Sequence, residues 1–311
     1  MNVKTYKTPT DFEAALVQRL AKVARDEAID VQRLRREVAY DRFLARLKHV
    51  SPDGFLLKGG VALDLRFARA EARRTKDIDI ETRIAMNMEE ATELIAKAAV
   101  ADLQDYFAFA VTKTPDAPII EDVPAYRFNI AAVIGKKKFE TFTCDIGIAD
   151  ENIGEPDMVV GRPLLEFAGI QPVALLAVPL PRHIGDKLHA YVRCHPNGKV
   201  SSRAKDLVDL ALVIAHREIA RAGDLRAALE HVFANRKEAL PTSFPPPPAH
   251  WKQSYPVIAE GIAVPGDYMD AHEIVATMLD PVLSTPLIWN IAGTRSSNSG
   301  LAEPTEVLER I

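Results

Sequence analysis

The chain has 311 residues, of which 26% are charged and 48% are hydrophobic. These proportions are typical of a folded globular protein, and they exclude a fibrous repeat and a globally disordered chain. At about 150 residues per domain, the length predicts two domains. The net charge of −4 does not indicate a nucleic-acid partner, so any such binding has to come from local basic patches.

The sequence predicts a cytoplasmic protein that makes no membrane contact. Its two cysteines, Cys144 and Cys194, lie far apart and have no metal-binding spacing, which suits a reducing compartment. The longest apolar run, Val173 to Leu180, is far shorter than the ~20 residues of a membrane span. Residues 1–20 contain no continuous apolar segment, so no signal peptide is expected.

The N-terminal half alternates between helical and strand-like patterns. Apolar residues at helical spacing predict two helices in the first fifty residues, one helix from the glycine turn to about 67 and one over 88–103. Strands are expected at 55–57, 76–82, 107–113, 126–134 and 138–148. Gly135 marks a hairpin turn between the last two strands, because glycine adopts positive φ without strain.

The C-terminal half is predicted to be helical from Pro163 onward. Helices are expected at 182–193, 204–217, 224–236 and 270–281. Residues 241–265 hold seven of the 21 prolines, which predicts an extended connector without regular helix. The expected fold class is therefore α+β, with an α/β domain over 1–165 and a helical domain over 166–311.

Two aspartates on the strand 76–82 form the first candidate site. Side chains alternate along a strand, so Asp77 and Asp79 share one face, and their backbones lie roughly 6–7 Å apart. Such carboxylates can converge on one divalent cation or straddle two. Oxygen ligands without thiol or imidazole favour Mg²⁺ or Mn²⁺.

Two further features extend this site toward a nucleoside triphosphate. Gly59 and Gly60 stand between a strand and a helix, where backbone N–H groups can approach phosphate oxygens. On the strand 138–148, Asp145 lies on the polar face, opposite Cys144 and Ile146, and supplies a third carboxylate. The alternative for Asp145 is a surface aspartate near a strand end.

A basic helix is the candidate RNA-binding surface. Arg35, Arg42 and Arg46 recur at spacings of seven and four and so share one face of the helix over 30–48. Such a face suits a phosphate backbone. The alternative is a solvated helix face.

Four segments resemble the AbiEii/AbiGii-type family of nucleotidyltransferase toxins, within the DNA polymerase β-like nucleotidyltransferases. They are LKGGVAL (57–63), RRTKDID (73–79), HIGDKLHAYVR (183–193) and SRAKDLVDL (202–210). The segments occur in the family's order, and the resemblance covers about residues 30–215. It implies a mixed polymerase β-like sheet with N-terminal helices and a C-terminal helical domain.

The resemblance also implies a role for individual residues. The implied metal ligands are Asp77, Asp79 and Asp145. The implied contacts to the nucleotide are Lys58, Gly59, Gly60, Thr75 and Lys187. Asp206 or Asp209 is the acid of the last motif, and the sequence does not decide between them. Lying three apart on a helix, both aspartates could instead anchor a nearby cation as a structural ion pair.

The implied activity is metal-dependent transfer of a nucleoside monophosphate from an NTP to an acceptor hydroxyl. Some members of the family modify the tRNA 3′ end and act as the toxin of a toxin–antitoxin or phage-defence pair. The expected partners are therefore an NTP, an RNA acceptor and a cognate antitoxin. The alternatives are a protein or small-molecule acceptor, or a catalytically silent module that binds a nucleotide or a protein.

Overall fold

The computed structural model describes residues 6–67, 75–84, 86–113, 125–147, 154–193, 203–216, 222–284, 288–289 and 295–296. These residues form two compact units. The first unit contains the described residues up to Val178, and the second contains those from Pro179 onward.

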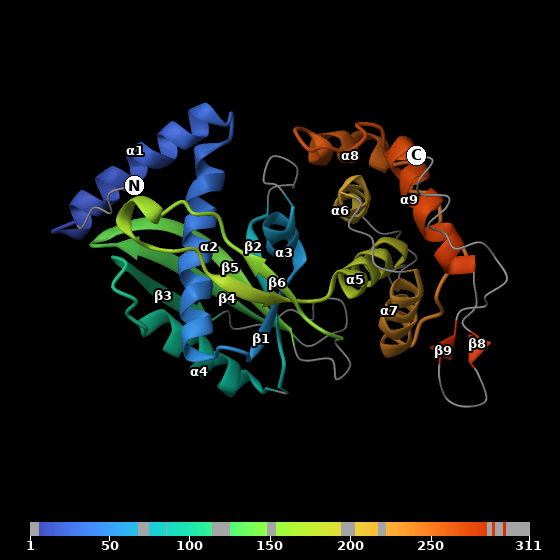
Figure 1. Ribbon diagram of the computed structural model, residues 1–311, viewed down its shortest axis with the longest axis horizontal. Coiled ribbons are helices and arrows are strands. Elements are labelled where there is room, and N and C mark those ends of the chain that lie inside the picture. The colour runs from blue at the N-terminus through green and yellow to red at the C-terminus, as the bar shows by residue number, and fades with distance from the viewer. Residues whose placement is uncertain are drawn as a thin grey trace. The chain divides into compact units, whose positions relative to one another are not determined.

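The first unit is built on one mixed sheet (Figure 1), which among the described residues has seven strands in the order β3-β4-β5-β2-β1-β7-β6. The strands are β1 (Phe55–Lys58), β2 (Asp77–Thr82), β3 (Phe107–Lys113), β4 (Ala125–Ile134), β5 (Lys137–Gly147), β6 (Asp157–Val160) and β7 (Ala174–Ala177). The pairs β2/β5 and β1/β7 are parallel, and the other neighbours are antiparallel. All five strands expected from the sequence are present.

One face of the sheet is apolar, and helices of the first unit pack against it. They are α1 (Pro9–Asp26), α2 (Val31–Val50), α3 (Gly59–Arg66) and α4 (Met88–Val100), and a short 3₁₀ turn follows at Glu166–Ala168. Phe43 of α2 packs edge-to-face on Phe142 of β5, with 5.7 Å between ring centroids. Ile78 and Ile80 of β2 are fully buried in the same core. The alternate residues of β2 therefore project from the opposite face.

The first unit extends beyond the boundary expected from the sequence because it includes strand β7. This strand pairs with β1 inside the sheet, with Leu57 opposite Ala177, so the first unit ends after Val178 rather than at the expected 165. The segment Ala174–Ala177 consists of alanine and leucine, which favour helix. The segment contains no polar residue, so it lacks the polar/apolar alternation that marks other strands, although its residues alternate between half-buried and buried.

The second unit is helical. Its helices are α5 (Leu180–Val192), α6 (Ala204–Ala215), α7 (Ala222–Asn235), α8 (Trp251–Ala259) and α9 (Tyr268–Ser284), and β8 (Ile288–Trp289) pairs with β9 (Arg295–Ser296). The four helices expected from the sequence are confirmed. None of the helices among the described residues combines the length and the apolar character that a membrane span needs.

The expectation that residues 241–265 contain no regular helix is wrong. Helix α8 forms there and includes Pro256. Trp251 and Tyr255, four residues apart and thus on one side of this helix, are both fully buried. Burial of two large aromatic side chains outweighs the hydrogen bond that the proline removes.

Candidate active site

Four charged side chains stand in direct register across the middle of the sheet. Asp79 on β2 is opposite Asp145 on β5. Beyond them, Arg127 on β4 is opposite Asp145, and Lys58 on β1 is opposite Asp79. Since residues in register project from the same face of a sheet, the two carboxylates lie side by side with a cationic residue beyond each.

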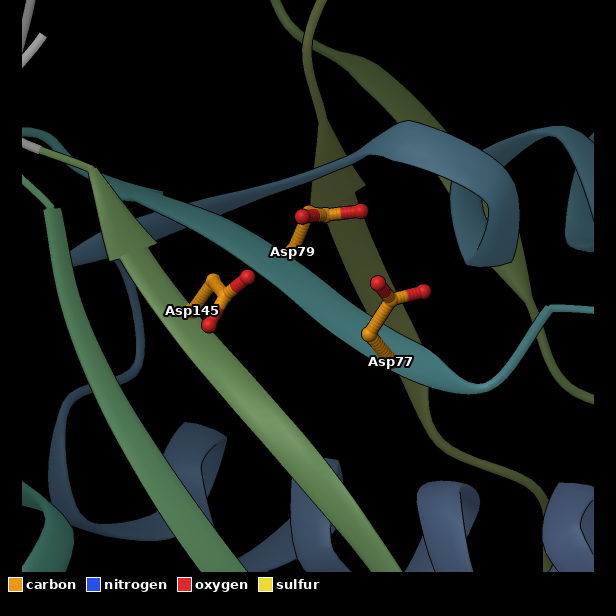
Figure 2. A group of neighbouring side chains, drawn as sticks. All are labelled: Asp77, Asp79 and Asp145. Atoms are coloured by element: carbon orange, nitrogen blue, oxygen red, sulfur yellow. The ribbon is translucent and has the colours of Figure 1, made fainter. Parts of the chain in front are cut away.

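Asp77 completes a carboxylate triad with Asp79 and Asp145 (Figure 2). One oxygen from each side chain lies within 4.8 Å of the other two. Asp77 and Asp79 share a face because they alternate on β2, and the parallel pairing of β2 with β5 brings in Asp145. The triad offers hard oxygen donors and fits a divalent cation such as Mg²⁺ or Mn²⁺. The structure thus brings together the three acids that the sequence indicated.

The glycine turn lies directly against this triad. Gly59 begins α3 with a φ of +64°. A Cβ atom added to it would stand 2.0 Å from Oδ2 of Asp79. Only glycine fits here, because a side chain would collide with the carboxylate and strain the backbone. The N-terminus of α3, which favours anions, is therefore next to the acids.

Thr75 is placed behind the triad as a support for Asp77. Its hydroxyl donates to Oδ1 of Asp77 over 3.0 Å, and the residue is 7% exposed. Such a bond fixes the orientation of the carboxylate. In the structure, Thr75 therefore holds a proposed metal ligand.

Lys58 extends away from its cross-strand partner Asp79. Its Nζ lies 3.6 Å from Oε2 of Glu81, a buried acid further along β2. A Cβ atom on Gly147 would stand 2.9 Å from the same Nζ. The lysine thus runs toward β5, and the absence of a side chain at Gly147 leaves room for it.

Arg127 belongs to the site and was missed from the sequence. Its Nε donates to Oδ1 of Asp145 over 2.7 Å and its Nη2 to Oδ2 over 2.6 Å. The hydrogen bond to Asp145 is the main cause that raises the pKa of Arg127. A bulge at Ala132/Val133 shifts the register of the β4–β5 hairpin. The buried residues Phe128, Ile130 and Ala132 alternate along β4 and place Arg127 on the polar face, but counted back from the turn without the bulge its partner would be Cys144 instead of Asp145.

The second unit holds a separate ionic cluster. Nζ of Lys187 on α5 lies 3.1 Å from Oδ1 of Asp206 and 2.7 Å from Oδ2 of Asp209, both on α6. Asp206 also contacts Nε of Arg203 at 2.8 Å. The exposed fractions of Asp206 and Asp209 are 0% and 1%. Both aspartates of the last motif therefore pair with Lys187. The pairing does not single out one of them as the acid of this motif.

The exposed basic face expected on α2 is absent, and this expectation is corrected. Arg42 and Arg46 are buried. Arg46 forms two hydrogen bonds to Asp105, of 2.8 and 2.6 Å. The Arg35 guanidinium donates to the carbonyl of Phe139 and lies 4.2 Å from the centre of its ring. The three arginines contact other parts of the first unit and do not form the exposed basic face that the sequence predicted.

Comparison with known proteins identifies the class of protein as a nucleotidyltransferase. The structure is similar to that of MenT4, a nucleotidyltransferase toxin from Mycobacterium tuberculosis H37Rv. The TM-score is 0.57, with 16% sequence identity over 86% of this chain and 90% of that chain, a likeness of fold. None of the curated proteins compared with the chain matches it.

The sequence profile of the family described as "Nucleotidyl transferase AbiEii toxin, Type IV TA system" matches residues 42–264, more than half of the chain. The chain therefore belongs to the AbiEii family of nucleotidyltransferase toxins, which act in type IV toxin–antitoxin systems. The resemblance found in the sequence motifs is confirmed.

Proposed function

We propose that this toxin transfers a nucleoside monophosphate from an NTP to the 3′ hydroxyl of an RNA, with tRNA as the first candidate, and that the reaction depends on a divalent cation. The observation that carries the proposal is the convergence of Asp77, Asp79 and Asp145 within 4.8 Å, with Gly59 directly beside them.

In the proposed reaction, the acceptor hydroxyl oxygen attacks the α-phosphorus of the NTP, and pyrophosphate leaves. Asp77, Asp79 and Asp145 would hold the divalent cations, which when bound would stabilise the negative charge that develops in the reaction. Backbone N–H groups of Gly59 and Gly60, at the N-terminus of α3, bind phosphate oxygens. Lys58 is proposed as a further cation for the nucleotide.

Lys187 is proposed as a cation that neutralises charge developing on the triphosphate. Its ion pairs with Asp206 and Asp209 fix the position of the ammonium, which supports this role. A lysine held in one place loses little conformational freedom when a phosphate binds, whereas a lysine on a mobile stem loses more. The two aspartates are thus proposed to position Lys187.

The proposed RNA contacts lie away from α2, where Arg42 and Arg46 are buried and Arg35 contacts Phe139. Lys136 and Lys138 are exposed at the turn between β4 and β5. The turn lies about 25 Å along β5 from Asp145, at ~3.3 Å per residue. Lysines at this distance suit the phosphate backbone of a folded RNA whose 3′ end reaches the triad.

The test is incubation of the full chain with total RNA and each labelled NTP in turn, with and without EDTA. We expect label in small RNA from a preferred NTP, and none in EDTA or with Asp77→Asn. Label in protein would replace the RNA acceptor by a protein acceptor. Label retained in EDTA would overturn the metal dependence, and the absence of any label would favour a silent binding module.

A further inference from the structure

Arg127 makes a planar, two-point contact with one member of the triad. Its Nε and Nη2 donate to the two oxygens of Asp145, at 2.7 and 2.6 Å. Two parallel N–H···O bonds require the guanidinium and the carboxylate to lie nearly in one plane. Rotation of the Asp145 carboxylate would break at least one of them, so the contact fixes the direction of its oxygens.

The contact is poorly placed to serve stability alone. The Arg127 side chain is 35% exposed, whereas that of Asp145 is 7% exposed. Solvent screens the half-exposed guanidinium, so the pair contributes less to folding than a fully enclosed contact of the same geometry. The pair also lies on the polar face of the sheet, in register with Asp79. Its geometry therefore bears on the site more than on the core.

We propose that Arg127 is a positioning residue for Asp145. Its fork holds the carboxylate so that one oxygen stays within 4.8 Å of the oxygens of Asp77 and Asp79. Each carboxylate oxygen keeps a further lone pair for a cation, because it accepts one hydrogen bond from Arg127. This inference rests on the proposed function, since it takes the triad as the divalent-cation site.

Arg127→Lys separates position from charge. Lysine keeps the positive charge but cannot form the planar fork. The main measurement is the affinity of the full chain for Mn²⁺ without nucleotide, obtained from the electron paramagnetic resonance signal of free Mn²⁺. The kcat and the thermal stability of each variant are measured as well. We expect Mn²⁺ affinity to fall by about tenfold or more and kcat to fall with it, as is typical when a partner of a metal ligand is lost.

A matched control exists in the same unit. Nη2 of Arg162 donates to both oxygens of Glu27 at 2.7 and 2.8 Å, and its side chain is 32% exposed. Arg162→Lys should therefore change neither Mn²⁺ affinity nor kcat. If Arg127→Lys also bound Mn²⁺ like the parent, its role as a positioning residue would be overturned, whatever its thermal stability.

The Asp145→Asn background tests whether Arg127 acts through Asp145. Once the carboxylate is gone, Arg127→Lys should add little further loss of Mn²⁺ affinity, whereas independent roles would give additive losses and overturn the inference. Mn²⁺ binding by the parent chain distinguishes failure of the proposed metal site from failure of the proposed role of Arg127. A parent that binds no Mn²⁺ overturns the proposed metal site, whereas a parent that binds it beside an unaffected Arg127→Lys overturns only the role of Arg127.

Discussion

The two ionic groups of this toxin differ in how their charges are balanced. In the first unit, three carboxylates converge and the guanidinium of Arg127 contacts one of them. In the second unit, Lys187 and Arg203 face two aspartates that are fully buried. Counted over the described residues, the triad sets three carboxylates against one contacting guanidinium, a negative surplus that a divalent cation can neutralise, whereas the buried cluster sets two cations against two aspartates. Changes in the triad should therefore alter activity more than stability, and changes in the cluster should alter both.

The largest effect is expected where the negative surplus is removed. Asp77→Asn or Asp79→Asn keeps the volume of the side chain and removes a metal ligand, so transfer should fall by about 10³-fold or more, equivalent to about 4 kcal/mol. The melting temperature should hold or rise, because repulsion among the carboxylates decreases. Labelled-nucleotide transfer and thermal melting measure both quantities.

Glu140→Gln is the control for these variants. Glu140 lies on β5, the strand that carries Asp145, but outside the triad. The Glu140→Gln variant should transfer nucleotide at the rate of the parent. Full activity in Asp77→Asn and in Asp79→Asn would show that the triad does not bind a catalytic cation.

Changes in the buried cluster should lower stability as well as activity. Lys187→Met leaves two buried aspartates without this cation, which should destabilise the fold by about 3–5 kcal/mol. It should also lower kcat/KM by about 10²-fold, the scale expected when a group that stabilises the developing charge is lost.

A second substitution separates the two effects of Lys187. Lys187→Met with Asp209→Asn removes one charge of each sign, so the melting temperature should recover in part while activity stays low. If activity recovered together with stability, Lys187 would be a structural lysine, and its proposed role at the triphosphate would be wrong.

The contact between the glycine turn and the triad can be broken without removing any charge. Gly59→Ala places a Cβ atom 2.0 Å from Oδ2 of Asp79 and forces alanine to a φ of +64°. The displaced carboxylate should lower the transfer rate by about 10²-fold, the scale of a 1 Å misplacement in an active site.

Gly261→Ala is a matched control for the backbone strain. Gly261 has a φ of +72°, and an added Cβ would have no described atom within 4 Å. Both variants should lose about 1–2 kcal/mol of stability, but only Gly59→Ala should lose activity. Equal activities in the two variants would contradict the contact with Asp79.

The sequence predicted the triad because strand alternation is a local property. Asp77 and Asp79 flank a buried isoleucine, and Asp145 follows a buried cysteine, so a period of two assigns each to the polar face. Parallel pairing of β2 with β5 then had to be observed, since no local pattern states which strands are neighbours.

Features that depend on distant contacts could not be predicted in this way. Arg46 is buried because Asp105, 59 residues away, neutralises it. A helical pattern alone cannot tell such an arginine from one that faces solvent. Arg127 faces Asp145 instead of Cys144 because a bulge shifts the β4–β5 register, and β7 is a strand because β1 pairs with it. In each case the deciding partner lies elsewhere in the chain.

The smallest effect is expected at Thr75, which supports the triad from behind. Thr75→Val removes the hydroxyl that donates to Oδ1 of Asp77 over 3.0 Å and keeps the branched shape of the side chain. Loss of one charge-assisted hydrogen bond should lower kcat by about tenfold, equivalent to about 1.4 kcal/mol. Thr75→Ser keeps the hydroxyl and should remain close to the parent. The split between kcat and KM decides the role: a raised KM for the NTP at unchanged kcat would instead mean that Thr75 binds the nucleotide, as the family resemblance implied.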